Sequence, residues 1–95
     1  MVIGTGIIVL QIDGCRSLKE KRSVVRSLVT RLGNTFNISI AETADQDRLQ
    51  RAQICLAMVG NDRRVINAKM DKVFNLAEEI ARARITHTEM EILNL

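Results

Sequence analysis

The spacing of hydrophobic residues along the chain predicts an alternation of strands and helices. Residues 2–13 are rich in β-branched side chains, alternate between two faces and stop at Gly14, which predicts a strand. Ser17 and Glu20 have the spacing of a capping box, and the apolar residues after them recur three and four positions apart. We therefore expect a helix that begins after Ser17 and continues to about residue 32.

The same alternation of patterns continues through the rest of the chain. Gly33 and Asn34 provide an expected helix stop, and Gly60–Asp62 supplies the turn and N-cap of a second helix. The remaining expected segments are a strand at 36–41, a polar connection at 42–51, a strand at 52–59, a helix from 63 to about 81 and a strand at 85–93.

The order strand, helix, strand, strand, helix, strand predicts an α+β fold. With right-handed crossovers it gives a ferredoxin-like βαββαβ sandwich, in which two helices cover one face of a four-stranded antiparallel sheet. Numbered along the chain, the expected spatial order of the strands is 4-1-3-2. The chain has no proline and no low-complexity run that would mark a boundary, so we expect a single domain over residues 1–95.

If both helices cover one face of this sheet, alternate residues of the central strands point away from them. Ile7 and Val9 on the first strand and Ala57 and Val59 on the third have this orientation, with polar residues on the outer strands. An apolar centre with polar margins is typical of a protein contact surface, so we predict a homodimer formed through these four residues. The alternative is the apolar surface that any small domain leaves exposed.

Positive charge is concentrated in one segment of the chain. Residues 16–31 contain six basic residues and one acidic residue, although the net charge of the whole chain is only +3. Lys19, Arg22 and Arg26 fall on one side of the predicted helix, and Arg16 lies just before it. This strip predicts contact with a phosphate backbone or with an acidic protein surface, and the alternative is a solvated helix face.

The sequence contains little that could perform catalysis or hold a cofactor. Cys15, Cys55 and His87 lack the neighbouring ligands or bases that a metal site or an activated nucleophile needs. We therefore expect no metal, no cofactor and no enzymatic activity, and we interpret the cysteines as reduced thiols of a cytoplasmic protein. The longest apolar run, Gly6–Leu10, is far too short to cross a membrane.

An alternative from another class comes from the loop Gly14–Ser17. The loop combines a glycine, Arg16 and a helix N-terminus, which are the parts of an anion-binding loop. Acylphosphatases share this element order and bind phosphate in the equivalent loop, so a small hydrolase of phosphorylated substrates is our second prediction. The longer glycine-rich loop of those enzymes is missing here, and Asp13 would repel an anion.

Three stretches of the chain resemble the YlxP-like family of small bacterial proteins of unknown function. They are Arg16–Val25, Ala44–Ala52 and Val59–Asp62, and the Ser-Leu-Lys-Glu-Lys-Arg run within the first is the most specific. The resemblance covers essentially the whole chain and implies a ferredoxin-like fold with no established catalytic residues. Genes of the family often lie near those for translation initiation and ribosome maturation factors. The resemblance therefore implies ribosomal RNA or a translation-related protein as partner.

Two positions depart from the family pattern. Leu49 stands where an aromatic residue often precedes the Gln-Arg pair, and Asp13 stands where proline is common. If the aromatic residue of other family members contacts their partner, this protein, with Leu49 in its place, binds its partner differently. The loop Asp45–Arg51 has two open interpretations, a contact loop or a locally hydrogen-bonded turn.

Overall fold

The computed structural model describes residues 1–95 and confirms the predicted element order. The N-caps form as expected: Ser17 Oγ accepts a hydrogen bond from the Glu20 amide, and the Asp62 side chain accepts from the amides of Arg64 and Val65. The elements are β1 (Val2–Gln11), α1 (Leu18–Thr35), β2 (Ser39–Ala44), β3 (Arg51–Gly60), α2 (Arg63–Ile80) and β4 (Arg84–Asn94).

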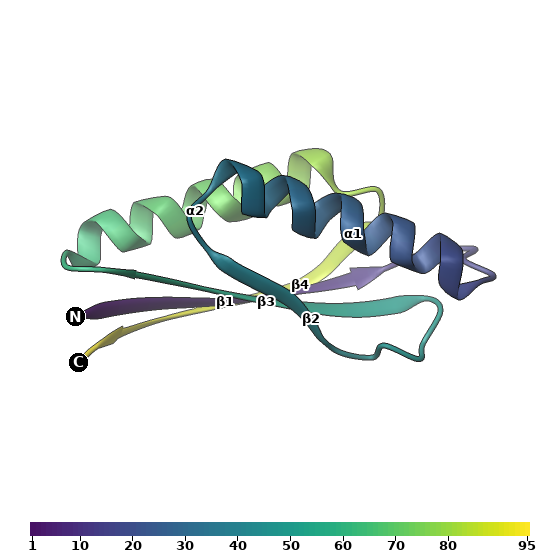
Figure 1. Cartoon of the computed structure of the whole chain (residues 1–95), viewed down its shortest axis with the longest axis horizontal. Helices are drawn as coiled ribbons and strands as arrows, with labels where there is room; N and C mark the ends of the chain where they lie inside the picture. Colours follow the sequence, from purple (N-terminus) through teal and green to yellow (C-terminus); the bar gives the residue numbers. More distant parts are fainter.

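The four strands form one antiparallel sheet in the order β2-β3-β1-β4, as the ferredoxin-like prediction requires. Figure 1 shows both helices on one side of this sheet and no element on the other side. The molecule is elongated, with Cα extents of 43 × 21 × 19 Å. One sheet face is therefore covered by helices, and we call the opposite one the open face.

The core lies between the helices and the covered face of the sheet. Alternate residues of the two central strands are buried there, and the helices add one side chain per turn. Only 21 of the 95 residues are buried, because the sheet contributes one of its two faces to the core. The most deeply buried apolar side chains are Ile8, Leu10, Leu32, Ile54, Ile66, Met70 and Val73.

Glycines on β1 and β3 allow α2 to lie close against the sheet. A Cβ atom added to Gly4 would lie 2.7 Å from Cγ2 of Ile66, and one added to Gly6 would lie 2.9 Å from Cε of Met70. Cβ atoms essentially never make contacts this short, so a larger residue at Gly4 would require Ile66 to shift, and one at Gly6 would require the flexible end of Met70 to shift. The glycines of the first strand therefore set the distance between helix and sheet.

Two expected boundaries are wrong, and both errors lie between α1 and β3. The helix continues through Gly33 and Asn34 to Thr35, and the Phe36 amide then caps it by donating to the Leu32 carbonyl at 2.9 Å. The next strand begins at Ser39 and includes residues 42–44, which polarity had assigned to a connection. The strand continues there because Glu42 takes part in a buried ion pair, described below.

Candidate functional site

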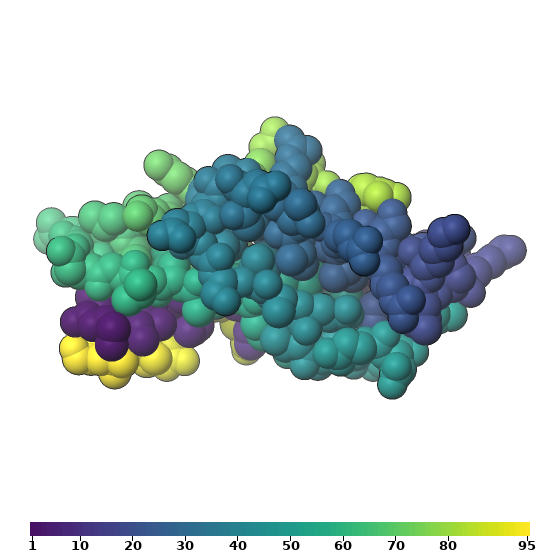
Figure 2. All heavy atoms as spheres, viewed as in Figure 1, coloured from purple at the N-terminus to yellow at the C-terminus, as the bar shows by residue number.

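The outer surface of α1 forms one side of an open groove of about 950 Å³. In Figure 2 this helix runs across the upper front of the molecule, in blue. The lining residues recur at helical spacing along α1, with one further residue from the turn before β4, and none is hydrophobic. They are Lys19, Arg22, Ser23, Arg26, Ser27, Thr30, Arg31, Asn34, Thr35 and Arg82.

Five of these residues are cations, and no acidic residue lines the groove. We call this set, Lys19, Arg22, Arg26, Arg31 and Arg82, the basic groove. None of the five forms an ion pair within the protein, whereas Lys21, Arg48, Arg51 and Arg84 all do. Arg82 reaches across to α1 and donates a hydrogen bond from Nη1 to Ser23 Oγ at 3.3 Å. The cations therefore remain available to an external anion, and the hydroxyls beside them add hydrogen-bond donors.

The basic groove meets a second hollow near the start of α1. This second hollow has a volume of about 450 Å³ and shares Lys19, Ser23 and Arg82 with the groove. Its other lining residues include the carboxylates of Asp13 and Glu20. Because these carboxylates repel phosphate, an extended anion would follow the groove toward the C-terminal end of α1.

The structure brings together three of the four basic residues predicted from sequence. Lys19, Arg22 and Arg26 line the groove, whereas Arg16 lies in the preceding loop and is not among the lining residues. Sequence reasoning missed Arg31 and Arg82 as members of the site. The helical spacing could have included Arg31, but only the fold places Arg82 beside α1.

The loop between β1 and α1 uses its hydrogen-bond donors internally. The Glu20 amide donates to Ser17 Oγ at 3.1 Å, as the predicted capping box requires, whereas the Glu20 carboxylate accepts from the Arg16 amide at 3.0 Å and not from the amide of Ser17. Gly14 has a φ of 73° and turns the chain into the helix. The carboxylate of Glu20 already accepts from the Arg16 amide, which a bound phosphate would need as a donor. The geometry therefore does not favour the phosphate-binding loop of the hydrolase alternative.

Asp13 lies at the outer end of the same loop and is paired with Arg84 of β4. Arg84 Nε donates to Asp13 Oδ2 at 2.8 Å, and Nη2 donates to Oδ1 at 3.3 Å. This hydrogen bonding lowers the pKa of the Asp13 carboxyl from its ordinary value and raises that of the Arg84 guanidinium. Both side chains are largely exposed, so the pair ties the loop to the last strand through water-accessible contacts.

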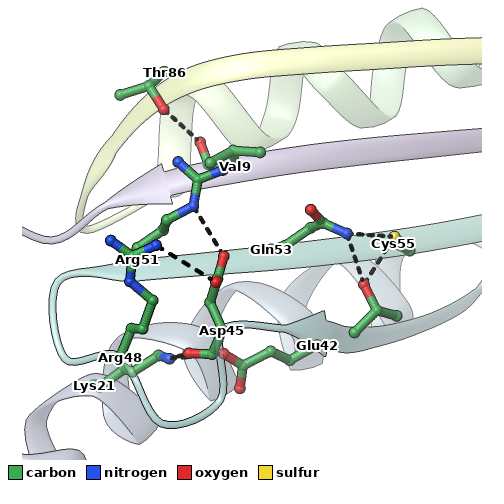
Figure 3. Close-up of polar contacts among 10 residues, drawn as sticks. Val9, Lys21, Glu42, Asp45, Arg48, Arg51, Gln53, Cys55 and Thr86 are labelled. Carbon is green, nitrogen blue, oxygen red and sulfur yellow. Dashed lines mark hydrogen bonds and ion pairs between the residues drawn. The ribbon is translucent and has the colours of Figure 1, made fainter.

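A buried ion pair, which the sequence reading did not identify, fixes β2 beneath α1. Lys21 is only 1% exposed, although it is a charged residue. Its ammonium lies 3.1 Å from Glu42 Oε2 and donates a hydrogen bond to the Asp45 carbonyl (Figure 3). Glu42 Oε2 is buried and accepts no hydrogen bond of good geometry, so the Lys21 charge is its compensation.

Asp45 connects this pair to the loop that precedes β3. It adopts a positive φ of 63°, and its carboxylate accepts a hydrogen bond from Arg51 Nε at 2.9 Å. Arg48 lies 3.7 Å from the other carboxylate oxygen. Within the structure the loop Asp45–Arg51 is thus a locally bonded turn, which is one of the two interpretations left open by its sequence (Figure 3).

On the open face, the four residues predicted for self-association differ in exposure. Ile7 and Ala57 are half-buried and Val59 is 65% exposed, whereas Val9 is only 3% exposed. Val9 has Gln53 and His87 as its neighbours on the adjacent strands, and these longer side chains flank it. The predicted role of Val9 as a contact residue is therefore wrong, because its side chain is already buried in the single chain.

Neither helix combines the length and apolar character that crossing a membrane requires. No group of three or more His, Cys, Asp or Glu side chains is placed to hold a metal ion.

Comparison with known proteins establishes the family. Residues 3–90 match the model described as "Protein of unknown function (DUF503)". The chain belongs to this family. It is also 35% identical over 75 residues to the uncharacterized protein YlxP of Bacillus subtilis (strain 168), a match that covers 79% of this chain and 82% of the relative. Both findings confirm the resemblance seen in the sequence.

One solved structure agrees with the fold. A putative chlorite dismutase aligns with a TM-score of 0.50 at 14% identity, over 99% of this chain, and this chain spans 45% of that one. A dimeric ferredoxin-like protein of unknown function from Thermobifida fusca aligns with a TM-score of 0.45 at 10% identity, over 98% of this chain and 92% of the other. At such identities the likeness concerns the fold alone.

Proposed function

We propose that this protein is a non-catalytic binding protein that holds the phosphate backbone of an RNA in the basic groove. The observation that carries the proposal is the set of five unpaired cations along one groove without an acidic residue among them. A protein that neutralises phosphates with lysine and arginine gains affinity by releasing counterions, and it needs no base contacts to do so. The groove offers this kind of contact.

The chain favours backbone contacts over stacking of bases. Its only aromatic residues, Phe36 and Phe74, pack against the hydrophobic core. Single-strand binding proteins that stack bases need aromatic side chains on their surface. Recognition in the groove is therefore expected to depend weakly on base sequence. Ribosomal RNA, which the family resemblance suggests, is the first candidate.

The length of the groove matches several consecutive phosphates. Its lining extends from Lys19 to Thr35 of α1, which corresponds to about 24 Å along the helix axis at 1.5 Å per residue. The hydroxyls of Ser27 and Thr30 lie between the cations and can donate to the same phosphate oxygens. The arrangement fits an extended polyanion better than a single small anion.

The test is direct binding of RNA at fixed salt by two triple variants of equal charge change. Replacing Lys19, Arg22 and Arg26 by alanine should weaken binding of a mixed-sequence RNA by about a hundredfold near 0.1 M salt, because three phosphate contacts are lost. The matched control replaces Arg64, Lys69 and Lys72, which are exposed on α2 and do not line the groove, and it should bind nearly as wild type.

Circular dichroism should show that both variants are folded, since alanine favours helix. Equal affinity of the two triple variants for RNA would show that the groove is only a solvated helix face. Binding of an acidic protein in place of RNA would contradict the proposal while keeping the groove as an interface.

A further inference from the structure

The open face of the sheet carries an ordered arrangement of apolar and charged side chains. In the register of the strands, Ile3 lies between Val59 of β3 and Leu93 of β4, and Ile7 lies beside Cys55. Val59 and Leu93 are 65% and 37% exposed and lie near the ends of β3 and β4, where they form an exposed apolar cluster with Ile3. One end of this face is therefore apolar and exposed, and no helix or strand covers the face (Figure 1).

The acidic side chains of the same face lie along one margin, whereas Arg51 and Arg84 lie at one end of the face, beside Gln11. Glu91 pairs in register with Thr5, and Glu89 pairs with Ile7, so both carboxylates occupy the β4 edge of the open face. The opposite margin belongs to β2, where Ser39 lies beside Ala57 and Ala41 beside Cys55. One margin is thus acidic, and the other is neutral with a hydroxyl donor.

The area of the face suits a second copy of this chain. The four strands contain 10, 6, 10 and 11 residues, and at about 3.3 Å per residue and about 4.8 Å between strands they give a flat area of about 590 Å². Because side chains make the surface uneven, its accessible area is larger than the flat area and approaches the roughly 800 Å² that each partner contributes to a stable interface. The face is large enough for a specific dimer.

Charge then selects among the ways in which two copies can be related by a two-fold axis. An axis across the strands, or an association edge to edge through β4, would bring Glu89 and Glu91 near their counterparts, and like charges opposite each other are destabilising. An axis parallel to the strands instead places β4 of one copy over β2 of the other. Glu91 then meets the hydroxyl of the partner's Ser39, and Val59 meets the partner's Ile3.

We infer that two copies of this chain pack their open faces together about a two-fold axis parallel to the strands. The apolar rows of the two copies cover one another, and the acidic margin of each lies over the neutral margin of the other. Such a contact is isologous, because the same residues are used from both sides. The helices of both copies remain outside. If the proposed function holds, the dimer presents two basic grooves on opposite surfaces.

The first test is the oligomeric state in solution. Sedimentation of the full chain at micromolar concentration should show a dimer, and Val59→Glu should weaken it by at least about a hundredfold, because the charge would be buried twice at the interface. Val65→Glu is the matched control, since Val65 is 47% exposed but lies on α2, outside the contact. A monomeric wild type, or equal effects of both variants, would overturn the inference.

The second test addresses the arrangement. Ser39→Lys should tighten the dimer by about two- to twenty-fold through two new ion pairs with Glu91, and Ser39→Glu should weaken it by a similar factor. Adding Glu91→Lys to Ser39→Glu should restore the affinity. Variants of Ser39 that leave the dimer unchanged would show that β2 does not face β4, which contradicts the proposed axis. None of these measurements involves RNA, so their outcome is independent of the groove.

Discussion

Replacing Lys21 by methionine should strongly destabilise the protein, although the substitution places an apolar side chain in an apolar environment. The side chain of Lys21 is 2% exposed and that of Glu42 is 20% exposed, and their charges lie 3.1 Å apart. Methionine has a similar length and would fill the same space. The carboxylate of Glu42 would then keep a buried oxygen with no compensating charge.

The expected magnitude follows from the cost of an uncompensated buried charge. Removing one partner of a buried ion pair costs about 3–5 kcal/mol. Because Glu42 retains some contact with water, the lower end, about 3 kcal/mol, is expected. With a urea dependence of about 2 kcal/mol per molar, the unfolding midpoint should fall by about 1.5 M. Replacing Glu42 by methionine as well should return the stability to within about 1 kcal/mol of wild type, since a buried pair and an apolar pair differ little.

The assay is urea unfolding followed by circular dichroism for the two single variants and the double variant. Lys72→Met serves as control, because Lys72 is exposed on α2 and its replacement should change stability by less than about 0.5 kcal/mol. If Lys21→Met unfolds at the same urea concentration as this control, the buried pair does not stabilise the fold as described. A double variant as unstable as the sum of the single changes would show that the two residues are not coupled.

Three further substitutions test other parts of the structure. Gly4→Ala should destabilise the protein by about 1–3 kcal/mol, because its Cβ would lie 2.7 Å from Ile66. Gly33→Ala should stabilise it by up to about 1 kcal/mol, because Gly33 lies in a helix and the nearest atom would be 3.6 Å away. Thermal unfolding measures both shifts, and a Gly4→Ala variant as stable as wild type would contradict the packing of α2. The Arg84 hydrogen bond lowers the pKa of Asp13 below its ordinary 3.8, so its contribution to stability is present above that pH and lost as pH falls below it. Asp13→Asn should therefore make acid unfolding less steep in that range, and an unchanged acid unfolding curve would show that the pair adds nothing.

The element order and the sheet topology could be predicted from the sequence because the hydrophobic period is clear in most segments. Ile54 and Leu56 alternate in burial with their neighbours on β3, and the capping residues Ser17 and Asp62 mark both helix starts. These signals are local and need no knowledge of the fold. The same holds for the three groove cations that share one side of α1.

The region from Gly33 to Ala44 was predicted wrongly for physical reasons. Gly33 was expected to end the helix, but it accepts helical geometry without strain and the cap forms three residues later at Phe36. Glu42 was interpreted as part of a polar connection, because polarity predicts exposure. Its partner, Lys21, lies on the apolar side of α1. Each charge is buried because it pairs with the other, and this pairing exists only when the helix lies over the strand.

The site itself was only partly accessible to sequence reasoning. Arg82 joins the basic groove from a turn far along the chain, so no local spacing could reveal it. Val9 follows the alternation of its strand, yet the longer side chains of Gln53 and His87 on either side leave it buried. In both cases the decisive neighbours are distant in sequence, and only the sheet register or the fold brings them together.

The salt dependence of RNA binding tests the central proposal most directly. If all five cations of the basic groove contact phosphates, log K for a single-stranded RNA should fall with log salt at a slope of about −3.5, at about 0.7 per contact. The variant without Lys19, Arg22 and Arg26 should retain two contacts and a slope of about −1.4. The account predicts this reduction of about two units in a folded protein. A wild type that binds no RNA at low salt, or a slope that the triple variant leaves unchanged, would contradict it.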